Sequence, residues 1–280
     1  EWLLSLVKPD LSSRPISEIT APEVLRVLRT VEARGRLETA TRLRATIGQV
    51  FRFAVATGRA DNDPTAALRG AIASPTVQHR AAITEPKAFG GLLRAIATYE
   101  GAPETKAALQ LIALTFGRPG EVRAAEWSEV DLENAIWSIP AQRMKMRRPH
   151  RIPLSPQALH VLRDLKEITG QRRFLFPSNR SAQRCMSENT INAALRRLGY
   201  GKDEMTGHGF RAAASSMLNE SGLWNPDAIE RQLAHVDADS VRRAYARADF
   251  WDERVRMMTW WAMRCEEMTA GDERNQKNHE

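Results

Sequence analysis

The sequence contains few cysteines and no long apolar run. Its 280 residues include only two cysteines, Cys185 and Cys265. Two thiols cannot build a disulfide scaffold or a four-thiolate zinc site by themselves, so we expect a reducing compartment. No apolar stretch approaches the roughly 20 residues that cross a bilayer, and no signal peptide is recognisable. These absences exclude a disulfide-rich secreted domain and a membrane-spanning protein, and they predict a cytoplasmic protein with no membrane partner.

The sequence also lacks the usual signatures of metal and nucleotide sites. None of its six histidines has another histidine or a cysteine at a close ligand spacing. No glycine-rich phosphate loop is followed by a lysine. We therefore expect a protein that works without a metal ion, ATP or another cofactor.

Lysine is scarce, whereas arginine is abundant. Of the 41 basic residues only 7 are lysine, which leaves 34 arginines and a net charge of +7. The guanidinium fork grips phosphate oxygens bidentately, so the composition favours a polyanionic partner. A GC-rich gene would also raise the arginine content, and composition alone leaves both interpretations open. Residues 1–80 hold 12 basic and 8 acidic residues and are the more basic part of the chain per residue.

Turn residues and composition divide the chain into two domains. We expect a small helical domain at 1–75, a linker at 76–82, a larger domain at 83–270 and a polar tail at 271–280. The chain begins with Glu1 rather than methionine, so we also expect that an upstream segment has been removed.

Hydrophobic periodicity predicts a mainly helical fold with a small antiparallel hairpin. Thr20 and Glu23 form a capping box, and an amphipathic helix follows from about Glu38. Residues 135–139 and 150–154 are expected to pair as strands. The helices expected after the hairpin lie at about 155–168, 187–198, 208–220, 226–234, 239–246 and 250–268.

Two polar segments interrupt apolar surroundings in the first half of the larger domain. Arg118 directly follows an apolar helix, and either an ion pair with Glu121 or an anionic ligand would explain its position. The hairpin at 142–151 holds five basic residues and no acidic one, although taken alone it fits a solvated turn.

Two further segments follow. His208 and Arg211 lie three residues apart at the start of a helix, where both side chains share one face and free N–H groups suit a phosphate. Taken alone, His208 also fits a simple helix cap. His235 is followed ten residues later by Tyr245, one of only three tyrosines, which taken alone fits a half-buried packing residue.

Taken together, these segments resemble the tyrosine recombinase (phage integrase) family, and within it the prophage and genomic-island integrases. The resemblance covers nearly the whole chain, with a core-binding domain at 1–75 and a catalytic domain at 83–268. Its motifs are TFGRPGE (115–121), MK (144–145), TGHGFR (206–211), QLAHV (232–236) and Tyr245.

The resemblance implies site-specific DNA recombination through a 3′-phosphotyrosyl intermediate. Tyr245 would be the nucleophile and Lys145 the acid for the 5′-oxygen, although its basic neighbours compete for that role. The phosphate would be held by Arg118, Arg211, His208 and His235, with Glu121 supporting Arg118. Backbone contacts to DNA are expected from Arg42, Arg44, Arg52, Arg143, Arg147 and Arg148.

The resemblance also implies partners and leaves alternatives. The partners would be double-stranded attachment-site DNA, three further copies of the chain in a synaptic homotetramer, integration host factor and an excisionase, at the nucleoid of a bacterium. Members of this subgroup usually carry an additional arm-binding domain, so the chain is expected to be a fragment with two core domains. The alternatives are a relaxing topoisomerase and a non-catalytic DNA-binding regulator with a degenerate recombinase fold.

Overall fold

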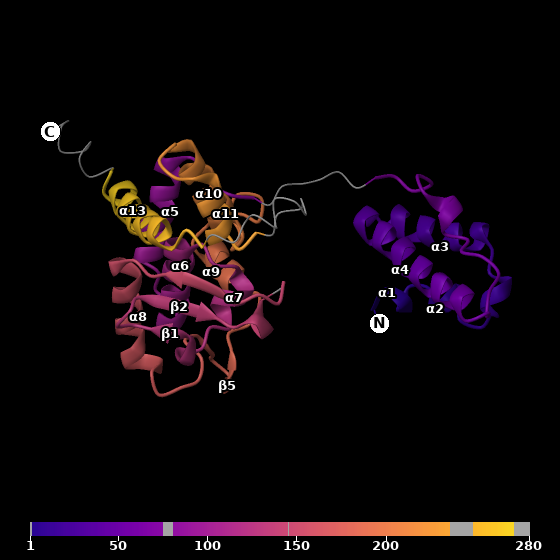
Figure 1. Ribbon diagram of the computed structural model, residues 1–280, viewed down its shortest axis with the longest axis horizontal. Helices are drawn as coiled ribbons and strands as arrows, with labels where there is room; N and C mark the ends of the chain where they lie inside the picture. The colour runs from indigo at the N-terminus through magenta and orange to yellow at the C-terminus, as the bar shows by residue number, and fades with distance from the viewer. Residues whose placement is uncertain (1, 75–80, 145, 236–248, 272–280) are drawn as a thin grey trace. The chain divides into compact units, whose positions relative to one another are not determined.

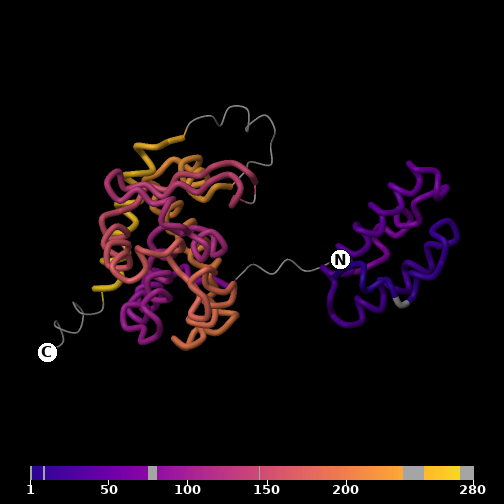
Figure 2. Tube along the Cα trace, turned by 90° about the horizontal axis from the view of Figure 1, so that it is seen from below, coloured from indigo at the N-terminus to yellow at the C-terminus, as the bar shows by residue number. Residues whose placement is uncertain are grey.

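The computed structural model describes residues 2–74, 81–144, 146–235 and 249–271 (Figure 1). Chain contacts divide it into two compact units, Glu1–His79 and Arg80–Glu280, which can be followed along the Cα trace in Figure 2. The mainly helical class with a small antiparallel sheet is confirmed. No helix within the described ranges is both long and apolar enough to cross a membrane.

Unit 1 is a small helical domain around its own apolar core. The capping box is confirmed, because Thr20 donates from its backbone N and its hydroxyl to the Glu23 carboxylate at 2.9 and 2.8 Å. Buried side chains of the two long helices, among them Leu28 and Phe51, form the core. The helices of unit 1 are α1 (Trp2–Ser5), α2 (Lys8–Leu11), α3 (Ala21–Ala33) and α4 (Leu37–Ala56), with 3₁₀ turns at Ile16–Glu18 and Ala66–Leu68.

Unit 2 combines helices with two small antiparallel sheets. Its helices are α5 (Pro86–Ala97), α6 (Pro103–Thr115), α7 (Pro119–Arg123), α8 (Pro156–Thr169), α9 (Thr190–Arg197), α10 (Gly209–Glu220), α11 (Pro226–Gln232) and α13 (Trp251–Ala270). The strands are β1 (Val130–Asp131), β2 (Ile136–Ile139), β3 (His150–Pro153), β4 (Pro177–Ser178) and β5 (Ser181–Cys185), with 3₁₀ turns at Trp127–Glu129 and Ala141–Arg143. The helix expected at 239–246 lies outside the described residues.

The predicted hairpin is confirmed. β2 pairs antiparallel with β3, and Ile139 lies opposite His150 at the end that leads into the basic hairpin segment. β1 adds a third strand beside β2. The antiparallel pair β4–β5 was not expected, because its exposed, polar β5 sequence SAQRC has no alternating apolar pattern.

The C-terminal helix α13 is built into the core of unit 2. Trp261 is fully buried, its ring lies 5.9 Å from that of Phe89 and 6.1 Å from that of Phe116, and its indole N–H donates to the Ala113 carbonyl at 2.9 Å. The buried apolar residues of this helix, among them Met257, Met258 and Trp261, therefore serve packing. Because Phe116 lies two residues before Arg118, α13 also supports the segment that presents this arginine.

Candidate active site

Arg118 lies in a tight turn between α6 and α7. Phe116 adopts a left-handed conformation, with φ of 41°, and ends α6. The Glu121 carboxylate then accepts from the Arg118 backbone N at 3.2 Å and from its Nη1 at 2.7 Å. Glu121 is 6% exposed, so a buried carboxylate both orients the guanidinium and balances its charge. The ion pair that the sequence left open as an alternative is therefore present.

Arg211 lies in the first turn of α10 and is buried. Its Nη1 donates to the Phe116 carbonyl at 2.7 Å and its Nη2 to the Leu233 carbonyl at 2.5 Å. Burial, and then the nearby Arg118, lower the pKa of Arg211 to about 10. The side chain therefore remains a cation at neutral pH, held at a fixed place by two backbone carbonyls.

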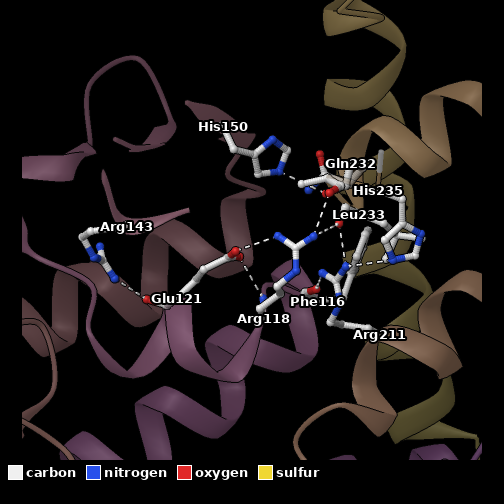
Figure 3. A network of polar contacts seen from close by, with 10 residues as sticks. Phe116, Arg118, Glu121, Arg143, His150, Arg211, Gln232, Leu233 and His235 are labelled. Atoms are coloured by element: carbon white, nitrogen blue, oxygen red, sulfur yellow. Dashed lines mark hydrogen bonds and ion pairs between the residues drawn. The ribbon is translucent and has the colours of Figure 1, made fainter. Parts of the chain in front are cut away.

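Three successive backbone carbonyls at the end of α11 bind side chains of this site (Figure 3). The Gln232 carbonyl contacts His150 Nε2 at 3.1 Å, the Leu233 carbonyl accepts from Arg211, and the Ala234 carbonyl accepts from Arg118 Nη2 at 2.7 Å. The last carbonyls of a helix have no intrahelical partner and carry partial negative charge. The end of α11 thus draws two arginines from different segments to one place.

His235 follows directly after these carbonyls. Its Nδ1 lies 2.7 Å from Glu230 Oε2, and its Nε2 lies 3.3 Å from Arg211 Nη2. Arginine can only donate, so the partners assign the proton of His235 to Nδ1 and the lone pair to Nε2. Glu230 was not among the expected site residues, although a carboxylate on the helix just before His235 could have indicated it.

His208 lies close in sequence to Arg211, one of the residues of this cluster. It is exposed and directly precedes α10, three residues before Arg211. A Cβ at Gly207 would come within 3.1 Å of Pro119 Cγ, so the loop that carries His208 lies against the turn that carries Arg118. Lys145 and Tyr245 lie outside the described residues.

The arginines expected at DNA differ in their surroundings. Arg42 on α4 and Arg147 and Arg148 in the hairpin are exposed. Arg44 donates to the Thr65 carbonyl at 3.5 Å, and Arg52 pairs with Asp63 at 3.0 Å.

Arg143, expected at DNA, is partly buried and has partners within the protein. Its guanidinium pairs with Glu129 and donates to the Glu121 carbonyl at 2.7 Å. The Glu129 side chain is 6% exposed and also accepts from the Trp137 indole at 3.1 Å. A buried carboxylate requires a cation, and Arg143 supplies it. Through Glu121, this arginine links the hairpin to the Arg118 turn.

Burial fixes the charge state of His150 at the start of β3. The side chain is 3% exposed, and burial, then the charge of Arg254, lower the pKa of His150 to about 3. The unfolded chain takes up a proton near pH 6.5, whereas the folded chain does so only near pH 3. Above pH 6.5 the ring is neutral in both states and costs no stability. As the pH falls below 6.5, the unfolded chain binds a proton that the folded chain does not, so the free energy of unfolding decreases.

We expect a glutamine at position 150 to weaken this dependence of stability on pH. Between pH 7 and pH 5 the wild-type chain should lose about 2 kcal/mol more unfolding free energy than His150→Gln. Urea titrations followed by tryptophan fluorescence measure this, because six of the seven tryptophans lie in unit 2. An equal loss in both proteins would contradict a neutral, buried His150.

Within the part of the chain that the structure describes, no three His, Cys, Asp or Glu side chains gather in a group that could hold a metal ion. The charged groups at the end of α11 are instead mainly guanidinium cations with internal partners. Such a cluster is suited to an anion with several oxygens.

Comparison with known proteins assigns the family. A model of the phage integrase central domain matches residues 1–71, and one of the phage integrase family matches residues 85–251. The putative protein IntB of Escherichia coli K12 is 42% identical over 90% of this chain, and the integrase of Enterobacteria phage P4 is 39% identical over 93%. The chain spans 67% and 62% of the lengths of these two relatives.

Solved structures share the fold. A lambda integrase fragment (75–356), solved as a dimer bound to a core site, matches with a TM-score of 0.66 at 22% identity, covering 89% of this chain and 86% of that one. The Tn1549 transposon integrase (82–397) in complex with circular intermediate DNA matches with a TM-score of 0.63 at 15% identity, covering 88% and 86%. These matches show the fold, and the two family models with the relatives of 42% and 39% identity establish that the chain belongs to the phage integrase family of tyrosine recombinases, in the branch of the prophage integrases.

Proposed function

We propose that the chain is a site-specific DNA recombinase that cuts and rejoins strands through a 3′-phosphotyrosyl intermediate and so integrates or excises a prophage or genomic island. The observation that carries the proposal is the meeting of Arg118, Arg211 and His235 at the end of α11. These side chains come from three distant parts of the sequence, and the cluster they form suits one phosphate group.

The arginines would act on the phosphate as charge builds on its non-bridging oxygens. A guanidinium has five N–H donors, so the internal carbonyl contacts of Arg118 and Arg211 leave donors for a ligand. Because these contacts fix both forks before DNA arrives, the transition state would be stabilised without reorganisation of the protein. His208 would add a hydrogen bond to the same phosphate, and Glu121 would keep Arg118 in place. His235 Nε2, which accepts from Arg211 before DNA binds, would donate to the phosphate only with a proton on that atom.

Tyr245 would attack phosphorus and release the 5′-oxygen, which Lys145 would protonate. The new 3′-phosphotyrosyl bond replaces the phosphodiester bond, so the energy needed for rejoining is conserved without ATP. A phenol ionises near pH 10, and the positive charge of the two arginines, with His208 as a base, would favour its ionised form at neutral pH.

The proposed partners are double-stranded attachment-site DNA and further copies of the chain. Lambda integrase has been solved as a dimer on a core site and as a tetramer on a Holliday junction, and it shares this fold. The exposed Arg42, Arg147 and Arg148 are the better candidates for contacts to the DNA backbone, whereas Arg44, Arg52 and Arg143 have internal partners. For integration host factor and an excisionase the support is family resemblance alone.

A nicked suicide substrate tests the proposed function. It loses its short leaving strand after cleavage and traps the covalent complex. We expect the wild-type chain to give a denaturant-resistant protein–DNA band in the presence of EDTA and without a nucleotide. A non-catalytic DNA-binding regulator would bind the same DNA and give no band, and that result would contradict the proposal.

Replacing Lys145 separates the acid from the other basic residues of the hairpin. Lys145→Ala should slow cleavage strongly, by about 10²-fold or more, because the 5′-oxygen then leaves without a proton. DNA affinity should hardly change, because one charge among many is lost. Sulfur in place of the bridging 5′-oxygen should restore the rate, since a thiolate leaves without protonation. If sulfur rescues Arg147→Ala or Arg148→Ala and not Lys145→Ala, the acid is a neighbour.

A further inference from the structure

Arg254 on α13 is a buried cation that none of the motifs includes. The residue is 0% exposed. Its Nε and Nη2 donate to Gln232 Oε1 at 2.9 and 2.8 Å, and its Nη1 donates to Asp249 Oδ1 at 3.0 Å and to the Asp249 carbonyl at 3.3 Å. Nη2 also donates to the Arg151 carbonyl. The whole fork is therefore used on three different segments of unit 2.

Anchoring α13 does not require this cation. Met257, Met258 and Trp261 are buried on the same helix and already attach it to the core. A buried ion pair contributes little net stability compared with an apolar residue of similar size, whereas its geometry can specify one arrangement of the chain. Arg254 remains charged at neutral pH, although burial lowers its pKa to about 10. Its contacts thus indicate that Arg254 fixes the relative positions of the segments it binds, rather than only stabilising the fold.

The partners of Arg254 lie at both ends of one stretch of chain. Gln232 lies three residues before His235, and Asp249 is the residue that follows 236–248, the stretch that contains Tyr245 in the sequence. Asp249 is held from a second side by Arg231 Nε at 3.1 Å. One guanidinium thus connects the residues just before this stretch to the residue just after it.

The same partners connect Arg254 to the phosphate cluster. The backbone carbonyl of Gln232 is the first of the three carbonyls at the end of α11, and the next two hold Arg211 and Arg118. Arg151, whose carbonyl Arg254 binds, follows His150 on β3. A shift of Asp249 relative to Gln232 would therefore be a shift relative to the arginines.

We propose that Arg254 is a positioning residue for strand cleavage, which holds Gln232 and Asp249, the described partners on either side of residues 236–248, at fixed places relative to Arg211 and His235. The inference rests on the proposed function, because it assigns the attack on DNA to a residue of this stretch. Fixing both ends of a chain segment restricts the conformations it can adopt. A nucleophile misplaced by about 1 Å can cost about 10²-fold in rate, so contacts remote from the phosphate can control the reaction.

The test compares Arg254→Met and Arg254→Lys with the matched control Arg264→Met. Arg264 lies on the same helix and forms an ordinary exposed pair with Glu267. Each variant is measured for thermal unfolding, for affinity to core-site DNA, and for the single-turnover rate of covalent complex formation on the suicide substrate. A fourth measurement uses hydrogen peroxide, which can attack the phosphate in place of the phenol and release the 5′-hydroxyl strand. Because peroxide supplies the attacking oxygen, this reaction should need the arginines but not Tyr245, and Tyr245→Phe is its reference.

We expect Arg254→Met to slow covalent complex formation by about 10²-fold, with DNA affinity within about twofold of wild type and peroxide cleavage equal to that of Tyr245→Phe. Arg254→Lys keeps the charge but loses the fork, so it should be about tenfold slower than wild type. Arg264→Met should match wild type.

Two outcomes would overturn the inference. One is a wild-type rate in Arg254→Met, and the other is an equal loss of tyrosine and peroxide cleavage, which indicates general damage to the site. If Arg254→Met does not fold, the same two criteria are applied to Arg254→Lys. A failure of the proposed function is distinguishable, because the wild-type chain itself would then form no covalent complex.

Discussion

Tyr245→Phe is expected to abolish covalent complex formation while DNA binding stays within about twofold. The substitution removes one oxygen, the atom that would attack phosphorus, and leaves the ring in place. The measurement is denaturing electrophoresis of the suicide-substrate reaction, together with a binding titration on the same DNA. A covalent band of wild-type intensity from Tyr245→Phe would contradict the assignment.

The other two tyrosines are unsuited to replace it. Tyr99 is 7% exposed, and its hydroxyl accepts from Arg197 at 3.3 Å. Burial, the largest influence, raises the pKa of Tyr200, so its phenol ionises even less readily than usual. We therefore expect Tyr99→Phe and Tyr200→Phe to retain cleavage, and they serve as matched controls for Tyr245→Phe.

Replacing Arg211 should have the second largest effect. Arg211→Lys keeps a positive charge, but its one nitrogen cannot take the places of Nη1 and Nη2, which bind the Phe116 and Leu233 carbonyls separately. Loss of one fixed donor at a developing oxyanion costs about 10²–10³-fold in rate, and we expect a decrease of this size in single-turnover cleavage. Arg264→Lys on the surface of α13 is the control. A decrease of less than about tenfold would indicate that Arg211 has no special role at the phosphate.

Local patterns made much of the fold predictable. The capping box at Thr20 and Glu23 marks the start of α3 within one residue, and the two strands that flank the basic hairpin were correctly paired. The β4–β5 pair was not predicted. Its sequence is polar and has no alternating pattern, so the formation of these strands depends on tertiary contacts.

The sequence predicts candidate residues for the site but not how they are arranged. The sequence places Arg118, Arg211 and His235 far apart, and what brings them together is a row of backbone carbonyls, which no side-chain pattern records. Arg143 was expected at DNA, and its pair with Glu129 was not foreseen, because a count of basic residues in the hairpin does not include a carboxylate that lies outside it. The contacts of Arg254 were not predicted for the same reason, since its partners lie 5, 22 and 103 residues away in the sequence.

The site of covalent attachment tests the central claim most directly. The trapped wild-type complex is digested with trypsin and a nuclease, and the modified peptide is sequenced by mass spectrometry. We predict that the peptide of residues 244–247 carries a nucleotide joined through its 3′-phosphate to Tyr245. A nucleotide on another residue, or a link through a 5′-phosphate, would contradict both the assignment of the nucleophile and the proposed reaction.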